Sequence, residues 1–177
     1  MSNVNGENAA FEPKLVGFFC NWCTYTAADT AGIGRMPIPA NLRVIRLMCS
    51  GRLEPAFVLK AFAEGADGVL VGGCHPGQCH YQEGNYKALR RVTLLKMALE
   101  QFGIEPERLH LEWISGAEAP KLSTVARTFT ETVRVLGPVG SVRETLKDLD
   151  PTVPRLADID AATVAAGPKP AVGGCCE

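Results

Sequence analysis

The sequence lacks any apolar run long enough to span a bilayer, and its polar first dozen residues contain no basic stretch leading into an apolar one. It also lacks an excess of charge, since 18 basic residues stand against 19 acidic ones, so it has no broad positive field for nucleic-acid binding. We therefore expect a soluble, cytoplasmic protein whose partners are proteins or small ligands. At 177 residues, the chain has the size of one ordinary domain plus a tail, and such a domain does not need disulfides to fold.

Cysteine is abundant instead, with seven residues in the chain. The cytosol keeps thiols reduced, so a disulfide framework is a poor explanation for this number. Metal binding or thiol redox chemistry explains it better, and we therefore expect the function to centre on the cysteines.

Short apolar runs alternate with helical patterns along the chain. Strands buried on both faces are predicted at four of these runs, residues 14–20, 44–48, 68–73 and 110–114. Helices are predicted at residues 55–64, 85–102 and 118–136. The second of these helices carries Leu89, Val92 and Leu95 on one apolar stripe. Glycines and prolines within residues 24–41 leave room there for only a short helix.

This alternation of strands and helices implies right-handed βαβ units. The predicted fold class is α/β, a small parallel sheet flanked by helices. We divide the chain into a polar N-terminal extension (1–12), a central domain (13–136), for which the resemblance described below implies iron–sulfur electron transfer, and a C-terminal extension (137–177). The last part is rich in alanine, proline and glycine after one short predicted helix, and we expect it to be a flexible tail or a partner-binding arm.

Five cysteines follow the ends of predicted strands. Cys20, Cys49 and Cys74 each stand where a strand ends, and Cys23 and Cys79 follow within the next few residues. The ends of parallel strands lie along one edge of a sheet, and neighbouring strands are about 4.8 Å apart. We therefore predict that the five thiols converge at one edge.

The two loops have the spacing of metal ligands, C-x-x-C and C-x-x-x-x-C. Four thiolates on such loops suit a 2Fe-2S cluster or a structural zinc ion, and spacing does not separate the two. The loop pairing favours Cys20, Cys23, Cys74 and Cys79 as ligands, with Cys49 less certain. A dithiol oxidoreductase that uses Cys20 and Cys23 is the alternative of another class, although five thiols on one edge argue against it.

Polar and aromatic neighbours of these cysteines have a bland interpretation as well as a functional one. Because thiols already outnumber the positions that a cluster offers, His75 and His80 are expected to be surface groups or hydrogen-bond donors beside it. Trp22 and Tyr81 either shield a cluster or simply cap the sheet edge. The run at 50–52 is expected to be an ordinary turn. Cys175 and Cys176 cannot be placed and remain unassigned.

With these residues in view, the chain resembles the delta (iron–sulfur) subunit of methyl-viologen-reducing hydrogenase, a family found with heterodisulfide reductase. The resemblance rests on strings that include Gly-Phe-Phe-Cys-Asn-Trp-Cys and Gly-Cys-His-Pro-Gly-Gln-Cys-His-Tyr. It extends over roughly residues 13–136, with matching segments at 17–23, 28–32, 46–52, 65–69, 73–81, 84–86, 103–108 and 112–113.

The resemblance implies a 2Fe-2S cluster, and it is this resemblance that favours iron over zinc. It further implies an electron relay from a nickel–iron hydrogenase, or from a formate dehydrogenase, to the flavin-bearing subunit of an electron-bifurcating heterodisulfide reductase. The chain would work inside a hetero-oligomer and catalyse no bond chemistry of its own.

Overall fold

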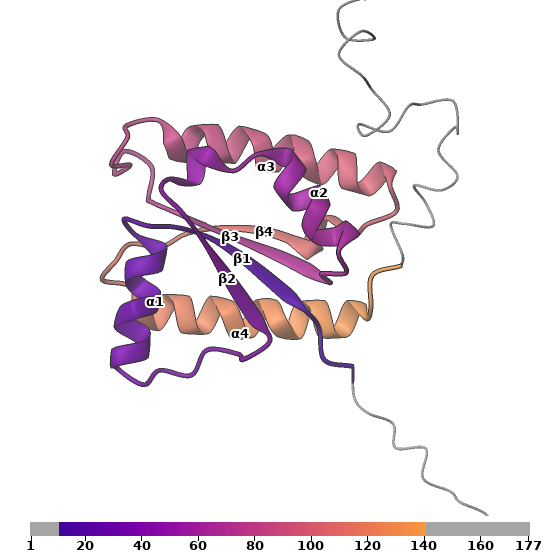
Figure 1. Ribbon diagram of the computed structural model, residues 1–177, viewed down its shortest axis with the longest axis horizontal. Coiled ribbons are helices and arrows are strands. Elements are labelled where there is room, and N and C mark those ends of the chain that lie inside the picture. Colours follow the sequence, from indigo (N-terminus) through magenta and orange to yellow (C-terminus); the bar gives the residue numbers. More distant parts are fainter. Residues whose placement is uncertain (1–10, 141–177) are drawn as a thin grey trace, which may run out of the picture. The chain divides into compact units, whose positions relative to one another are not determined.

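The computed structural model describes residues 11–140 of the chain. Four parallel strands form one sheet in the order β2-β1-β3-β4 (Figure 1). The strands are β1 (Leu15–Cys20), β2 (Leu42–Leu47), β3 (Gly68–Gly73) and β4 (Leu109–Trp113). The predicted α/β fold with a small parallel sheet is therefore confirmed.

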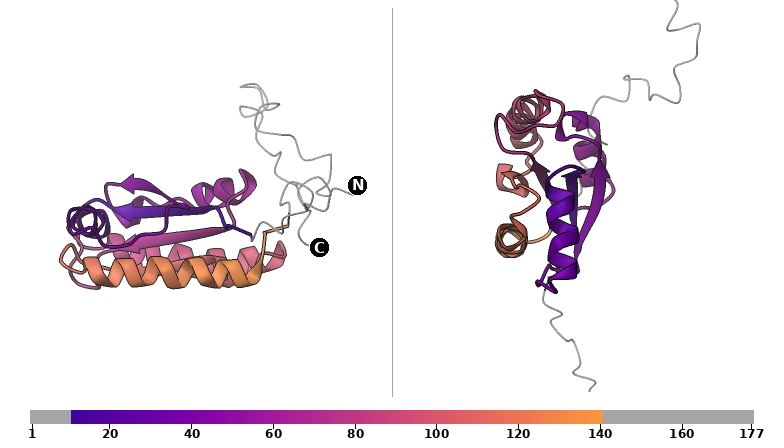
Figure 2. Two further views of the ribbon diagram at one scale, coloured as in Figure 1. Left: turned by 90° about the horizontal axis from the view of Figure 1, so that it is seen from below. Right: turned by 90° about the vertical axis from the view of Figure 1, so that its left-hand side faces the viewer.

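Helices cover both faces of this sheet. One layer contains α2 (Pro55–Ala63) and α3 (Gly84–Gln101), and the opposite layer contains α1 (Thr24–Ile33) and α4 (Ala119–Leu136) (Figures 1 and 2). Each layer has its own apolar core against the sheet. The first is built around Phe18, Val71 and Val92, the second around Phe19, Leu70 and Leu122.

The central strands are buried on both faces as predicted, but the prediction is wrong for β2 and holds only in part for β4, where Leu109 is buried and the other four residues are half-buried. All six residues of β3 are buried, whereas Val44 and Ile45 of β2 expose 39% and 48% of their surface. β2 is an edge strand with a single neighbour, β1. A groove of about 850 Å³ lies there, lined by Val16, Ile45 and Phe57 among other residues.

Two predicted helical features also change in detail. In α3 the buried stripe contains Ala88, Val92 and Leu95, while Leu89 is 44% exposed. Residues 24–41, where a short helix was expected, contain the ten-residue helix α1, which ends at Ile33 before Gly34.

The amino edge of the sheet is closed by a buried arginine. Arg108, 1% exposed, donates hydrogen bonds to the carbonyl oxygens of Asp67 (3.1 Å), Leu136 (3.2 Å) and Gly137 (2.9 Å). Its Nε donates to the Glu105 carboxylate at 2.6 Å. The guanidinium thus joins the start of β3 to the end of α4, and each of its nitrogen atoms donates a hydrogen bond.

None of the helices found within residues 11–140 is long and apolar enough to cross a membrane. The expectations for the first ten residues, for the predicted helix after residue 141 and for Cys175 and Cys176 fall outside the described residues.

Candidate metal centre

The carboxyl edge of the sheet brings together all five cysteines singled out from the sequence. Cys20 ends β1, and Cys74 directly follows β3, the neighbouring strand. Cys49 lies just beyond β2, while Cys23 and Cys79 stand at the starts of the segments that lead into α1 and α3. Each of the five side chains is buried, with at most 9% of its surface exposed.

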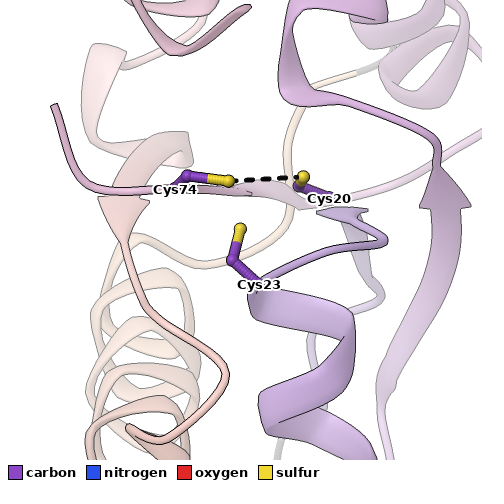
Figure 3. Close-up of side chains that lie close together, drawn as sticks. All are labelled: Cys20, Cys23 and Cys74. Carbon is purple, nitrogen blue, oxygen red and sulfur yellow. Dashed lines mark hydrogen bonds between the residues drawn. The ribbon is translucent and has the colours of Figure 1, made fainter. Parts of the chain in front are cut away.

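Three of the thiols form a compact group. The sulfur atoms of Cys20, Cys23 and Cys74 all lie within 4.8 Å of one another, and Cys20 and Cys74 are 3.7 Å apart (Figure 3). The C-x-x-C segment is the predicted tight turn, since the Cys23 amide donates to the Cys20 carbonyl at 3.4 Å.

Cys49 and Cys79 form a second pair, with their sulfur atoms also 3.7 Å apart. This pair lies against the first residue of α3, where only glycine fits. A Cβ atom on Gly84 would lie 2.1 Å from the Cys49 sulfur and 3.1 Å from the Cys79 sulfur. A Cβ on Gly51 would in turn lie 2.7 Å from the Gly84 Cα, so both glycines are needed to seat this pair.

The loop between Cys74 and Cys79 is held from within the protein. Asn85, 1% exposed, donates its side-chain amide to the carbonyl oxygens of Cys74 (3.3 Å) and His75 (2.8 Å). Gly77 adopts a positive φ of 79°, which a residue with a side chain rarely does. The loop is therefore shaped by buried polar contacts and by glycine.

Helix N-termini face this edge, because helices run antiparallel to the strands that precede them. α1 begins directly after Cys23, and α3 begins at Gly84, with four residues between it and the Cys74–Cys79 loop. Although burial opposes it, backbone N–H groups of Tyr81, Asn85 and Gly84 lower the pKa of Cys79. Such amide groups stabilise negative charge, as an anionic cluster or thiolate requires.

The other thiols respond to one another and to burial. The Cys23 thiol, followed by backbone N–H groups of Trp22 and Ser50, lowers the pKa of Cys20 to about 5. The neighbouring Cys20 and burial raise the pKa of Cys23. Burial raises the pKa of Cys49 to about 11 and also raises that of Cys74.

The two histidines beside these cysteines contact other side chains, Glu118 and Trp22. His75 Nε2 lies 2.6 Å from Glu118 Oε2, which also accepts a hydrogen bond from the Ser115 amide at 2.7 Å. The Ser115 amide and then His75 lower the pKa of Glu118 to about 2. His80 stacks on Trp22 with ring centroids 4.0 Å apart.

Trp22, His80 and Tyr81 form an exposed aromatic cap at the same edge. The Trp22 indole N–H donates to the Tyr81 hydroxyl at 3.4 Å, and the His80 ring meets Tyr81 edge-on at 5.1 Å. Trp22 and Tyr81 expose 46% and 51% of their surface. These side chains belong to the chain segments that carry Cys20, Cys23 and Cys79, and they are open to solvent.

Ser50, Gly84 and Glu118 are site residues that sequence reasoning did not identify. Ser50 and Gly84 take part through close packing between segments distant in the sequence, which no local pattern reports. Glu118 begins a predicted helix, and the acidic residue at that position was a signal only for the helix boundary.

The donor set suits a cluster with two metal centres. Two thiolates on one tetrahedral metal ion, with metal–sulfur bonds of about 2.3 Å, lie about 3.8 Å apart. Both sulfur pairs match that distance at 3.7 Å. Within residues 11–140, Cys20, Cys23 and Cys74 make up the only group of three or more thiols in which all sulfurs lie within 4.8 Å of one another. Among these residues no four thiols are gathered this closely, as the four ligands of a single zinc ion would be.

Comparison with known proteins gives one family match. The sequence profile of the family described as methyl-viologen-reducing hydrogenase, delta subunit, matches residues 15–137. A relative from Methanococcus voltae, the iron–sulfur subunit of the F420-non-reducing hydrogenase vhc, is 57% identical over 128 residues. The alignment covers 72% of this chain and 89% of that relative. The corresponding iron–sulfur protein of Archaeoglobus profundus is also 57% identical, with 93% of its length covered.

A second type of relative is much longer than this chain. In Methanosarcina mazei, one of the subunits of ferredoxin:CoB-CoM heterodisulfide reductase is 46% identical to this chain over 129 residues. The alignment covers 73% of this chain but only 16% of that protein. The same domain therefore occurs both as a small separate protein and as one part of a long reductase chain.

Proposed function

Because the chain belongs to the methyl-viologen-reducing hydrogenase delta subunit family, we propose that it is an electron-transfer subunit carrying one 2Fe-2S cluster. The observation that carries this proposal is the pair of 3.7 Å sulfur contacts, Cys20–Cys74 and Cys49–Cys79, at one buried edge. A 2Fe-2S cluster takes four thiolates, two on each iron. Each sulfur pair can supply one iron.

This pairing leaves Cys23 as the surplus thiol. Loop spacing alone favours Cys23 over Cys49 as a ligand, whereas the two 3.7 Å sulfur contacts include Cys49 and not Cys23. Cys20, Cys23 and Cys74 together would offer three thiolates at one end of the cluster, where an iron takes two. We therefore propose that Cys20 and Cys74 share one iron and that Cys23 stays protonated beside them.

Serine variants of the five cysteines test this assignment one by one. We expect Cys49→Ser to lose most of its cluster absorbance and Cys23→Ser to keep it, since only the first removes a ligand. Iron and acid-labile sulfide per chain measure the result after anaerobic preparation. If the Cys23 variant loses the cluster while the Cys49 variant retains it, the loop-based pairing is correct instead.

The competing functions make different demands on the same thiols. A dithiol oxidoreductase needs an accessible thiolate, and Cys20 is only 1% exposed. That alternative predicts disulfide reductase activity that depends on Cys20 and Cys23 alone. A structural zinc module predicts a colourless protein that retains one zinc ion when iron and sulfide are supplied. Metal analysis and electron paramagnetic resonance of the reduced protein distinguish all three.

The bound cluster would supply one-electron transfer, and the polypeptide controls where and how readily that occurs. The thiols hold the irons, while the N-terminus of α3 presents backbone N–H groups to the Cys79 sulfur. Asn85 and the close-packed glycines keep the sulfur pairs in place. Burial of all five cysteines keeps bulk water away from them.

The partners we propose are a nickel–iron hydrogenase or a formate dehydrogenase as electron donor and the flavin-bearing subunit of a heterodisulfide reductase as acceptor. The long relatives support such an acceptor, because a domain encoded within a heterodisulfide reductase chain is held beside the rest of that chain. We expect a hetero-oligomer in the cytoplasm, where thiols stay reduced.

The aromatic cap is the surface that we propose for docking the flavin-bearing reductase chain. Electrons cross only short distances through protein, so the acceptor must approach the cysteine edge. Trp22 and Tyr81 are of the types that dominate binding energy at interfaces, and their mutual hydrogen bond holds them in place before binding.

The double variant Trp22→Ala/Tyr81→Ala tests this docking surface. We expect at least tenfold weaker binding to the flavin-bearing reductase chain, with the cluster retained. Leu94→Ala/Met97→Ala on α3 is the matched control, because those side chains are 67% and 62% exposed but lie outside the cap. Equal weakening by both double variants would refute the assignment of the surface and leave the cluster proposal intact.

A further inference from the structure

Ser50 has a buried hydroxyl without a partner at the metal edge. The residue follows Cys49 directly and begins the short 3-10 helix Ser50–Arg52. It is 1% exposed, and its Oγ atom makes no hydrogen bond within the part of the chain that the structure describes. Asn41 Oδ1 is the other such buried side-chain atom in residues 11–140, and its residue lies at the opposite edge of the sheet, before β2. Since buried hydroxyl groups are nearly always satisfied, this one requires an explanation.

The hydroxyl lies above the last residue of β3, Gly73. A Cβ atom on Gly73 would lie 3.0 Å from Ser50 Oγ and 2.7 Å from the Trp113 ring. Gly73 immediately precedes Cys74, and it adjoins Cys20 because Phe19 and Gly72 are register partners. Ser50 is therefore enclosed by Gly73, Trp113 and the two strand ends that carry the first sulfur pair.

The backbone of Ser50 already faces one of these sulfurs. Its N–H group faces the Cys20 thiol. Its carbonyl accepts a hydrogen bond from the Leu53 amide at 3.0 Å. The main chain of Ser50 is thus engaged on both sides, and only the hydroxyl is left without a partner beside a group of sulfur atoms.

Resting on the proposed cluster, we infer that the Ser50 hydroxyl donates a hydrogen bond to a sulfur atom of the 2Fe-2S cluster and raises its reduction potential. Reduction adds an electron to an already anionic group. A hydrogen bond to sulfur stabilises the more negative form more strongly, so the donor makes the cluster easier to reduce. Ser50 is then a positioning and tuning residue, not a ligand.

Redox titration of the anaerobically prepared protein, followed by electron paramagnetic resonance, tests the inference. We expect Ser50→Ala to retain its iron and sulfide and to show a lower reduction potential than the wild type. Ser50→Thr, which keeps a hydroxyl, should restore the potential most of the way. An unchanged potential in the alanine variant would overturn the inference.

Ser123→Ala is the matched control for a buried serine. Ser123 is 6% exposed, but its hydroxyl donates to the Pro37 carbonyl at 2.6 Å, away from the cysteines. We expect its removal to leave the potential unchanged. An equal shift in both serine variants would show that general loosening of the protein lowers the potential, and would overturn a specific hydrogen bond.

A measurement on the wild type removes the dependence on variants that fail to fold. In a crystal structure of the cluster-loaded protein, Ser50 Oγ should lie within hydrogen-bond reach of a cluster sulfur. A hydroxyl turned toward water or toward a backbone carbonyl would contradict the inference while leaving the cluster itself in place. A wild-type protein that holds zinc would instead overturn the proposed function.

Discussion

The two edges of the sheet differ in how far their buried polar side chains are hydrogen-bonded. At the amino edge, the Arg108 guanidinium donates to three backbone carbonyls and a carboxylate. At the carboxyl edge, the hydrogen-bonding neighbours of the five buried thiols are mainly other thiols. The Ser50 hydroxyl there has no hydrogen-bond partner among residues 11–140. The Arg108 network is complete as the polypeptide folds, and Asn41 Oδ1 is the one buried side-chain atom of the amino edge without a partner within residues 11–140. The carboxyl edge has the composition of a site that a ligand completes.

The largest effect on the free energy of unfolding is expected from breaking the amino edge. Arg108→Met removes donors from three carbonyl groups and should lower the free energy of unfolding by about 3 kcal/mol. The cluster content should not change, because Arg108 lies at the opposite edge. Urea unfolding followed by circular dichroism measures the loss. Arg90→Met is the control, since Arg90 is exposed and bonds only the Tyr86 carbonyl; equal losses would refute this role of Arg108.

A smaller loss of stability, but a strong effect on the metal, is expected from Gly84→Ala. The new Cβ would lie 2.1 Å from the Cys49 sulfur, so the Cys49–Cys79 pair must separate. We expect a several-fold fall in iron per chain and a destabilisation of about 1–3 kcal/mol.

Gly32→Ala in α1 is the matched control for Gly84→Ala, because its Cβ meets nothing within 4 Å. It should stabilise the protein by up to about 1 kcal/mol, through helix propensity alone. Full iron content in the Gly84 variant would show that the pair is not tightly seated.

Removal of the metal should loosen one edge and spare the other. The Gly51 amide donates to the Cys49 sulfur at 3.4 Å, whereas the Val139 amide donates to Asp67 Oδ1 at 3.2 Å. After chelation under anaerobic conditions, we expect the Gly51 amide to exchange with solvent about tenfold faster and the Val139 amide to be unaffected. Hydrogen exchange resolved by residue measures both. Uniform acceleration would contradict a local role for the metal.

The smallest effect on stability is expected from replacing Glu118. Its carboxylate accepts a hydrogen bond from the Ser115 amide and lies 2.6 Å from His75 Nε2. Its pKa is lowered to about 2 by these contacts, from about 4.3 in an unfolded chain. The stabilising contribution should therefore be present above about pH 4.3 and disappear as the pH falls toward 2.

Comparison of Glu118→Gln with the wild type across this range tests the expectation. The difference in thermal midpoint should be small, since the carboxylate is exposed, and should shrink below about pH 4. A constant difference across the whole acid range would show that the charge of Glu118 does not contribute.

Most of the fold follows from local sequence patterns. The continuous apolar runs of β1 and β3 and the boundaries of α2, α3 and α4 are within a few residues of their predicted positions. The exposure of β2 could not be predicted, because an apolar run does not report whether its strand has one neighbour or two. The predicted burial of Leu89 is wrong for a similar reason, because packing against the sheet determines which side of α3 is buried.

The candidate site likewise has features that local sequence patterns predict and features that only tertiary packing determines. The amino-acid sequence alone determined that five cysteines would leave the ends of parallel strands, because strand ends and turns are local features. Only the tertiary structure decided which thiols meet, since sulfur pairing depends on strand order and on glycines 51 and 84 packing together. The sulfur atom of Cys20 consequently lies 3.7 Å from that of Cys74, although 54 residues separate the two in the sequence.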